Sequence, residues 1–145
     1  MNRITVMLAA VWLGMQIMAG YVAAPILFKA LPKLQAGAIA GELFDFLAYA
    51  GLAVWSLVYI VHARAVKPLP IRLSSRKGIV ALWVLLAGNQ FLVTPVIEAH
   101  KSQSENWLLS LVGGSFGMWH GISSLIFMIS AVLAAVLVWR LIKAD

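Results

Sequence analysis

The sequence predicts an all-α integral membrane protein, a bundle of four transmembrane helices. Of its 145 residues 63% are apolar. Only 11% are charged, whereas an ordinary soluble domain has about 25%. The apolar residues gather in four stretches of the length needed to cross about 30 Å of hydrocarbon. The stretches are rich in Leu, Ala, Met and Ile and do not alternate as strands do, which disfavours a transmembrane barrel. The length fits a single domain over residues 1–145.

Each helix follows from a run of uncharged residues. The first run, Ile4–Phe28, is longer than the 7–15-residue apolar core of a signal peptide, so we interpret it as a membrane helix. The second run begins at Phe46, but Pro32 at a first-turn position and the helix-compatible residues after it extend the helix upstream. No internal repeat is evident. The four helices are predicted at about 4–28, 33–63, 78–98 and 105–142.

Basic residues predict the orientation. Eight Lys and Arg residues lie in the N-terminal segment, the loop between helices two and three, and the C-terminal segment, whereas three lie in the other two loops. The positive-inside rule then places both termini in the cytoplasm of a multi-pass protein of the inner (plasma) membrane. The net charge of +6 therefore indicates orientation in a lipid bilayer and not nucleic-acid binding. The basic loop Arg64–Lys77 could also contact anionic headgroups.

No catalytic constellation is visible. The chain has no cysteine, which excludes disulfides, zinc knuckles and thiolate catalysis. It also lacks a Gly-rich phosphate loop, a nucleophile elbow and an HExxH pair. We therefore predict no catalytic residue and no cofactor. The favoured function is that of an accessory, assembly or helix-packing partner subunit, in a homodimer or a larger membrane protein complex.

Polar side chains inside a bilayer are costly, so the few that are present mark a candidate site. At 100° per residue Glu42 and Asp45 share one face of the second helix, while His120 lies near the outer end of the fourth. The predicted outer-leaflet pocket consists of Glu42, Asp45, Asn89, Gln90, Glu98 and His120. An imidazole with carboxylates could bind a divalent metal or relay a proton. The favoured interpretation is a neutral, structural His120 with solvated carboxylates.

Small residues predict the helix-packing faces. Gln16 and Gly20 share a small-residue face of the first helix, which points at a neighbouring helix. On the fourth helix Gly113, Gly117 and Gly121 recur every four residues, a spacing that allows two helices to approach closely. We expect this contact within the bundle or in a homodimer.

The order of several short motifs resembles that of a known family. These motifs are Pro25-Ile-Leu-Phe28, Ala36–Gly41 followed by Leu43-Phe44, Asn89 with Pro95, and His120-Gly-Ile-Ser123. Together they resemble the bacterial branch of the transmembrane protein 205-like family, a four-helix membrane domain of unknown function. The resemblance implies an integral membrane protein without an established activity, in which Pro25, Asn89, Pro95 and His120 match the family pattern.

A second resemblance supports the alternative function. Size and helix count are similar to those of copper-resistance D-type and protoporphyrinogen oxidase-type membrane proteins, which bind haem or copper through intramembrane histidines. The first helix of this chain contains no histidine. The alternative is therefore a haem- or metal-binding redox protein in which His120 acts with outer-leaflet carboxylates.

Overall fold

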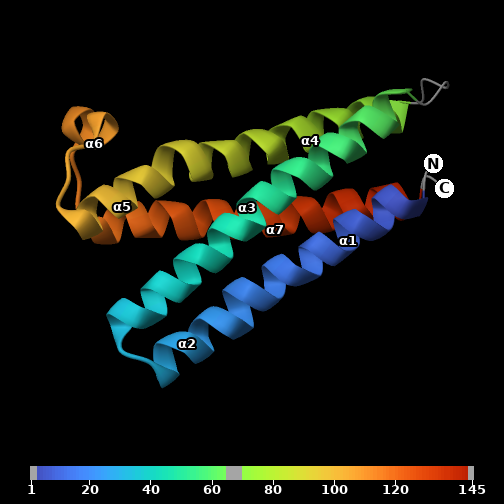
Figure 1. The fold of residues 1–145 in the computed structure, drawn as a ribbon. Helices are drawn as coiled ribbons and strands as arrows, with labels where there is room; N and C mark the ends of the chain where they lie inside the picture. The colour runs from blue at the N-terminus through green and yellow to red at the C-terminus, as the bar shows by residue number, and fades with distance from the viewer. Residues whose placement is uncertain (1–2, 65–69, 144–145) are drawn as a thin grey trace.

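The fold is known from a computed structural model, which describes residues 3–64 and 70–143. The described parts are helical and contain no strand. Four helical stretches are long and apolar enough to cross a membrane (Figure 1). This confirms the predicted all-α fold with four membrane helices. The four spans are Arg3–Ala30, Lys33–Arg64, Ser75–Ser102 and Phe116–Lys143.

Two of the spans are interrupted by a wider, π-helical turn. In the first, η1 (Ala19–Ala23) joins α1 (Arg3–Met18) to α2 (Ala24–Ala30). Proline cannot donate a backbone hydrogen bond, and its ring clashes with the carbonyl group four residues upstream. For Pro25 that carbonyl belongs to Tyr21, which lies within η1. The π-helical turn thus accommodates the proline without ending the helix.

The third span uses the same arrangement. Here η2 (Asn89–Val93) joins α4 (Pro70–Gly88) to α5 (Thr94–Ser102), and Pro95 follows. The helix predicted over residues 78–98 is therefore longer at both ends. Between these spans, α3 (Lys33–Arg64) is a single uninterrupted helix.

The two helical hairpins share one register, although no internal repeat is evident in the sequence. The π-helical turns, at 19–23 and 89–93, lie 70 residues apart, as do Pro25 and Pro95. Buried positions of α1 recur at the same interval in α4: Thr5 and Ser75, Ala9 and Ile79, Trp12 and Leu82, Gln16 and Leu86. The first hairpin (α1 to α3) and the second (α4 to α7) thus share the same spacing of buried residues, π-helical turn and proline.

The predicted helix 105–142 is wrong in one respect, because the structure divides it in two. A short helix, α6 (Trp107–Val112), is capped by Asn106, whose side chain accepts hydrogen bonds from two backbone N–H groups. The chain then bends before α7 (Phe116–Lys143). Gly113 and Gly114 have φ angles of 70° and 101°, a region that glycine enters at little cost. Gly113 is therefore part of the bend and not of a helical packing stripe.

The main core lies where all four spans meet, and its residues come from α1, α3, α4 and α7. It occupies the half of the molecule that holds the two chain ends, the side predicted to be cytoplasmic (Figure 1). Trp12 of α1 connects several parts of this core. The Trp12 indole Nε1 donates to the carbonyl oxygen of Leu47 over 2.9 Å, and the Trp12 ring meets Trp55 edge to face with centroids 6.1 Å apart. Gly51 of α3 lies against the same indole. This small residue lets α3 approach α1 closely.

Toward the opposite end the two hairpins diverge. Figure 1 shows α2 and the start of α3 bending away from α5 and the start of α7. A second, smaller core holds the second hairpin together at this end, formed by Val93, Val96, Ile97 and Trp119. The outer surface remains apolar along every span, as a helix surrounded by lipid requires. Exposed large apolar residues on the spans include Leu34, Met7, Ile4, Val132, Val11 and Trp139.

Candidate functional site

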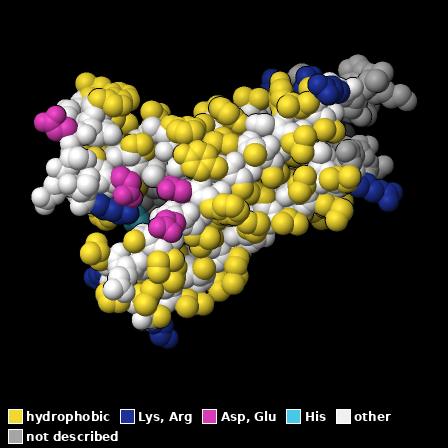
Figure 2. Space-filling model, viewed as in Figure 1, with side chains coloured by type: hydrophobic (Ala, Val, Ile, Leu, Met, Phe, Trp, Pro, Cys, Tyr) yellow, Lys and Arg dark blue, Asp and Glu magenta, His cyan; other side chains and the backbone are white. Residues whose placement is uncertain are grey.

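A hollow opens between the two hairpins where they diverge. Figure 2 shows it flanked by acidic and basic side chains, on a surface that is otherwise mostly apolar. Its inner limit is an aromatic contact: Phe127 of α7 meets Phe44 of α3 with ring centroids 5.2 Å apart, and Tyr21 of the first span at 6.5 Å. Beyond these rings the hairpins separate. We call this hollow the outer cleft.

The floor of the outer cleft is polar. The Gln90 amide nitrogen in η2 donates to the Asp45 carboxylate of α3 over 2.9 Å, which links the two hairpins. Beside it, Asn89 Oδ1 is buried without a hydrogen-bond partner in the described part of the chain. The structure thus brings together three of the six predicted pocket residues. The π-helical turn supplies two of them.

His120 projects into the outer cleft. It lies seven residues before Phe127, about two turns, so both side chains leave the same face of α7. Phe127 touches the first hairpin, whereas His120, beyond the point of divergence, is exposed. Its ring stacks on Phe116 with centroids 5.8 Å apart and planes within 9°. Across residues 3–64 and 70–143, His120 makes no side-chain hydrogen bond or ion pair with the predicted carboxylates.

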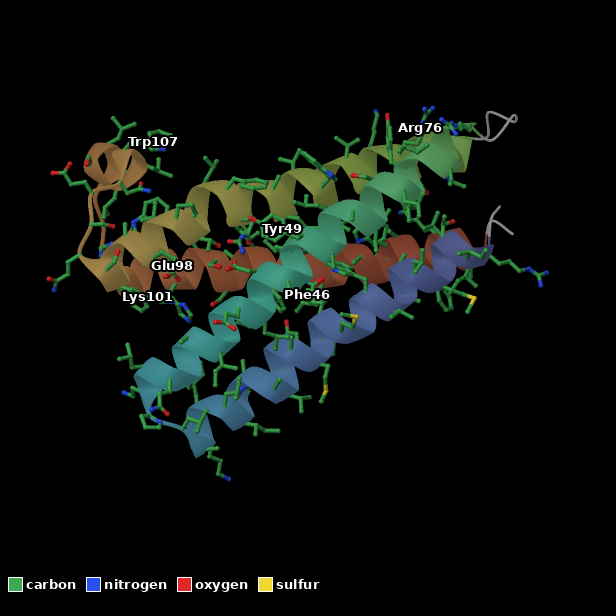
Figure 3. All side chains as sticks on the ribbon, in the orientation of Figure 1. Phe46, Tyr49, Arg76, Glu98, Lys101 and Trp107 are labelled. Atoms are coloured by element: carbon green, nitrogen blue, oxygen red, sulfur yellow. The ribbon has the colours of Figure 1, made fainter. Side chains whose placement is uncertain are left out.

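The other two predicted carboxylates lie at the margins of the outer cleft. Glu98 pairs with Lys101 one turn further along α5, at 2.8 Å between oxygen and nitrogen. Figure 3 shows both residues at the diverging end of the molecule. Glu42 is exposed and lies one turn before Asp45, on the same face of α3. The cleft therefore carries carboxylates on both walls.

The donor set does not form a compact metal site. Among the residues that the structure describes, no group of three or more His, Cys, Asp or Glu side chains is placed to hold a metal ion. Two imidazoles contact the same aromatic ring: His100 of α5 meets Phe116 edge to face with centroids 6.4 Å apart, and His120 stacks on Phe116. His100 Nε2 is buried without a partner in the described residues.

The predicted packing residues separate into two groups. Gln16 donates to the backbone oxygen of Phe127 over 3.2 Å, and Gly20 lies against the Phe127 ring, so both residues lie at the contact of span one with α7. Gly117 and Gly121 are exposed, and no other described helix lies within 4 Å of the position that a Cβ would take there. These two glycines thus leave a smooth patch on α7 that has no neighbouring helix among the described residues.

Phe127, Phe116 and His100 are site residues that the sequence analysis missed. Phe127 marks the inner limit of the cleft, because its ring contacts Tyr21 of the first span and Phe44 of α3. A phenylalanine among so many apolar residues carries no signal by itself. The seven-residue spacing between His120 and Phe127, which places both on one face of α7, is a pattern that could have indicated Phe127.

His120 is exposed and its described contact is a ring stack, so His120→Gln should change stability little. We expect an apparent melting temperature in detergent close to that of the wild-type protein, since no buried hydrogen bond is lost. A fall as large as that caused by disrupting a buried polar pair would show that His120 is a structural histidine.

A family model described as "Domain of unknown function (DUF4149)" matches residues 7–106. The matched region covers the first span from residue 7 onward, the second and third spans and both π-helical turns, and it ends before α6. No curated protein and no solved structure matches the chain.

Proposed function

The chain belongs to the DUF4149 family of domains of unknown function, and from this premise we propose that it is an accessory or assembly subunit that binds a partner transmembrane helix in its outer cleft. The partner is a second copy of this chain or another member of a membrane protein complex. The resemblance to the transmembrane protein 205-like family, which also lacks an established activity, agrees with this proposal.

The observation that carries the proposal is the polar floor of a cleft between membrane helices. Asn89 Oδ1 has no hydrogen-bond partner among the described residues, and the Asp45 carboxylate accepts a hydrogen bond from Gln90. Lipid tails cannot donate a hydrogen bond to either residue, and polar groups left unsatisfied in hydrocarbon are costly. A helix that carries a hydrogen-bond donor can satisfy these groups. Interrupted helices at corresponding positions of two repeated halves also mark the binding site in many membrane transporters. Here both π-helical turns lie at the level where the cleft begins.

Photo-crosslinking tests the proposal at two positions on α7. A photoreactive amino acid at His120 faces the cleft, whereas one at Leu125, which is also exposed, lies about 140° around the helix and faces lipid. In native membranes we expect a discrete protein adduct from position 120 and lipid adducts from position 125. The mass of the adduct distinguishes a second copy from another subunit. Lipid adducts from both positions would contradict the proposal.

The alternative function, a haem- or metal-binding redox protein, has its own test. The visible spectrum and the metal content of gently purified protein report haem or copper directly. We expect neither, because the described His and carboxylate side chains do not gather around one point. A stoichiometric Soret band or bound copper would replace the accessory function with a redox one, with His120 and His100 as first candidates for ligands.

The proposal includes an orientation, with both termini on the cytoplasmic side of the inner membrane. The uneven distribution of Lys and Arg supports it. Reporter domains fused after Ala65 and after Ser102 should therefore report opposite sides of the membrane, the first cytoplasmic and the second external. Equal signals from the two fusions would refute this orientation, and exchanged signals would invert it.

A further inference from the structure

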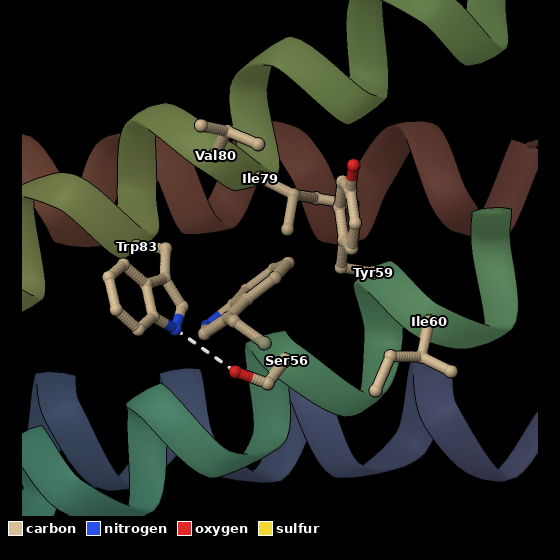
Figure 4. Close-up of a pocket in the computed structure, with 7 residues that line it drawn as sticks. Ser56, Tyr59, Ile60, Ile79, Val80 and Trp83 are labelled. Atoms are coloured by element: carbon tan, nitrogen blue, oxygen red, sulfur yellow. Dashed lines mark hydrogen bonds between the residues drawn. The ribbon is translucent and has the colours of Figure 1, made fainter.

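A second hollow lies at the other end of the molecule, independent of the outer cleft and of the function proposed for it. It is a groove of about 340 Å³ between α3 and α4. Trp55, Tyr59, Ile79, Val80 and Trp83 line it, and most of these side chains are open to the lipid-facing surface (Figure 4). The Nε1 of Trp83 donates to Ser56 Oγ over 3.0 Å. This bond pairs Trp83 with Ser56, whereas the Nε1 of Trp55 is buried without a hydrogen-bond partner among the described residues. The rest of the groove lining is formed mostly by aromatic and branched apolar side chains.

The groove leads from this hydrogen bond toward basic side chains. On α4, Trp83, Val80 and Arg76 follow one another at three- and four-residue intervals, so they lie along one face. From Trp83 to Arg76 the distance along the axis is about 10 Å at 1.5 Å per residue. The Arg76 guanidinium carbon lies 5.8 Å from the centroid of the Tyr59 ring, which forms one wall of the groove. Arg76 therefore stands at the end of the groove.

The sequence around Arg76 is strongly basic. Residues 64–77 contain five Lys or Arg and no Asp or Glu. Figure 3 shows Arg76 at the end opposite Glu98 and Lys101. The acidic residues that the structure describes lie toward that opposite end, as Figure 2 shows for the visible face: they are Glu42, Asp45, Glu98 and Glu105. No described carboxylate is thus near to neutralise the basic end of the groove.

We propose that the groove binds one acyl chain of an anionic phospholipid, whose phosphate group contacts Arg76. Aromatic and branched walls fit a hydrocarbon chain, and a guanidinium binds phosphate through charge-assisted hydrogen bonds. Exposed Arg64 and Lys77 add positive charge beside the same headgroup. The occupant is thereby a lipid with an apolar chain and a negative headgroup, of which phosphatidylglycerol is the simplest example.

Native mass spectrometry of the full-length protein tests this, with phosphatidylglycerol and phosphatidylcholine of identical acyl chains as probes. We expect retained phosphatidylglycerol and little phosphatidylcholine. Arg76→Gln should weaken phosphatidylglycerol binding about fivefold, the factor that corresponds to one basic residue at a membrane surface. Arg76→Lys should keep the preference for the anionic lipid because the charge remains. Val80→Trp should reduce binding by filling the groove without changing charge.

Lys143→Gln is the matched control. Lys143 lies over the Trp139 ring at 4.6 Å, at the same end of the molecule but on α7. Its loss should leave the bound lipid unchanged. Three outcomes would each overturn the proposal: equal retention of the two lipids, equal loss of lipid in Arg76→Gln and Lys143→Gln, or undiminished binding in a folded Val80→Trp variant.

Discussion

Gly51→Ala should lower the free energy of unfolding by about 1–3 kcal/mol, the usual cost of inserting a methyl group into a filled core. A Cβ at position 51 would lie 2.6–2.8 Å from atoms of the Trp12 indole. The indole cannot easily move aside, because it is buried, donates to the Leu47 carbonyl oxygen and abuts fully buried Trp55. The expected result is a clear fall in the apparent melting temperature of the purified protein in detergent.

Gly14→Ala is the control for this experiment. Gly14 is also a helical glycine of the first hairpin, but nothing lies within 4 Å of the position that its Cβ would take. Its replacement should leave stability unchanged or raise it slightly, since alanine favours the helix. Equal melting temperatures for the two variants would show that α1 and α3 do not pack through Gly51.

Asp45→Leu should also destabilise the protein by about 1–3 kcal/mol, the penalty for a buried donor left without its acceptor. The donor is the Gln90 amide, which is only 9% exposed and bonds to Asp45 at 2.9 Å. Replacing both residues with leucine should recover most of the loss, because no orphaned polar group then remains. Thermal unfolding of the single and double variants in detergent measures both effects.

Glu42→Leu provides the comparison for this pair. Glu42 shares a helix face with Asp45 but is exposed, so its removal should cost little. If Glu42→Leu destabilises as much as Asp45→Leu, general loss of charge and not the Asp45–Gln90 bond explains the effect. A double variant no more stable than Asp45→Leu alone would equally contradict the predicted pairing.

Much of the fold could be predicted from the sequence, because hydrophobic length determines where a chain crosses a bilayer. Apart from the face of the first helix that carries Gln16 and Gly20, the faces on which the helices pack could not be identified from the sequence. In water an apolar stripe marks the buried face, but in lipid the exposed face is apolar as well, so Trp12 and Trp83 look alike in sequence. Only Trp12 is in the core, whereas Trp83 is 40% exposed. The break at Gly113 was missed because glycine also suits close helix packing.

The candidate site was predictable in part. The polar side chains Asp45, Asn89 and Gln90 stand out in apolar runs, and the structure places them together at the floor of the cleft. The cleft itself depends on how far two hairpins diverge, which is a property of packing beyond Phe127 and is not visible in local patterns. Pro25 and Pro95 are visible in the sequence, but the π-helical turns that precede them were not predicted from it.

Distances between spin labels report whether the two hairpins diverge to form an open outer cleft. The absence of cysteine makes double-cysteine variants straightforward to prepare. One label pair, at Phe28 and Met118, spans the outer ends of the first and fourth membrane helices; the other, at Met7 and Ile142, spans their inner ends, and all four residues are exposed. Because the two hairpins diverge, we expect a clearly longer distance for the outer pair than for the inner pair in lipid bilayers. An outer distance equal to or shorter than the inner one would mean a closed, parallel bundle and would rule out an open outer cleft.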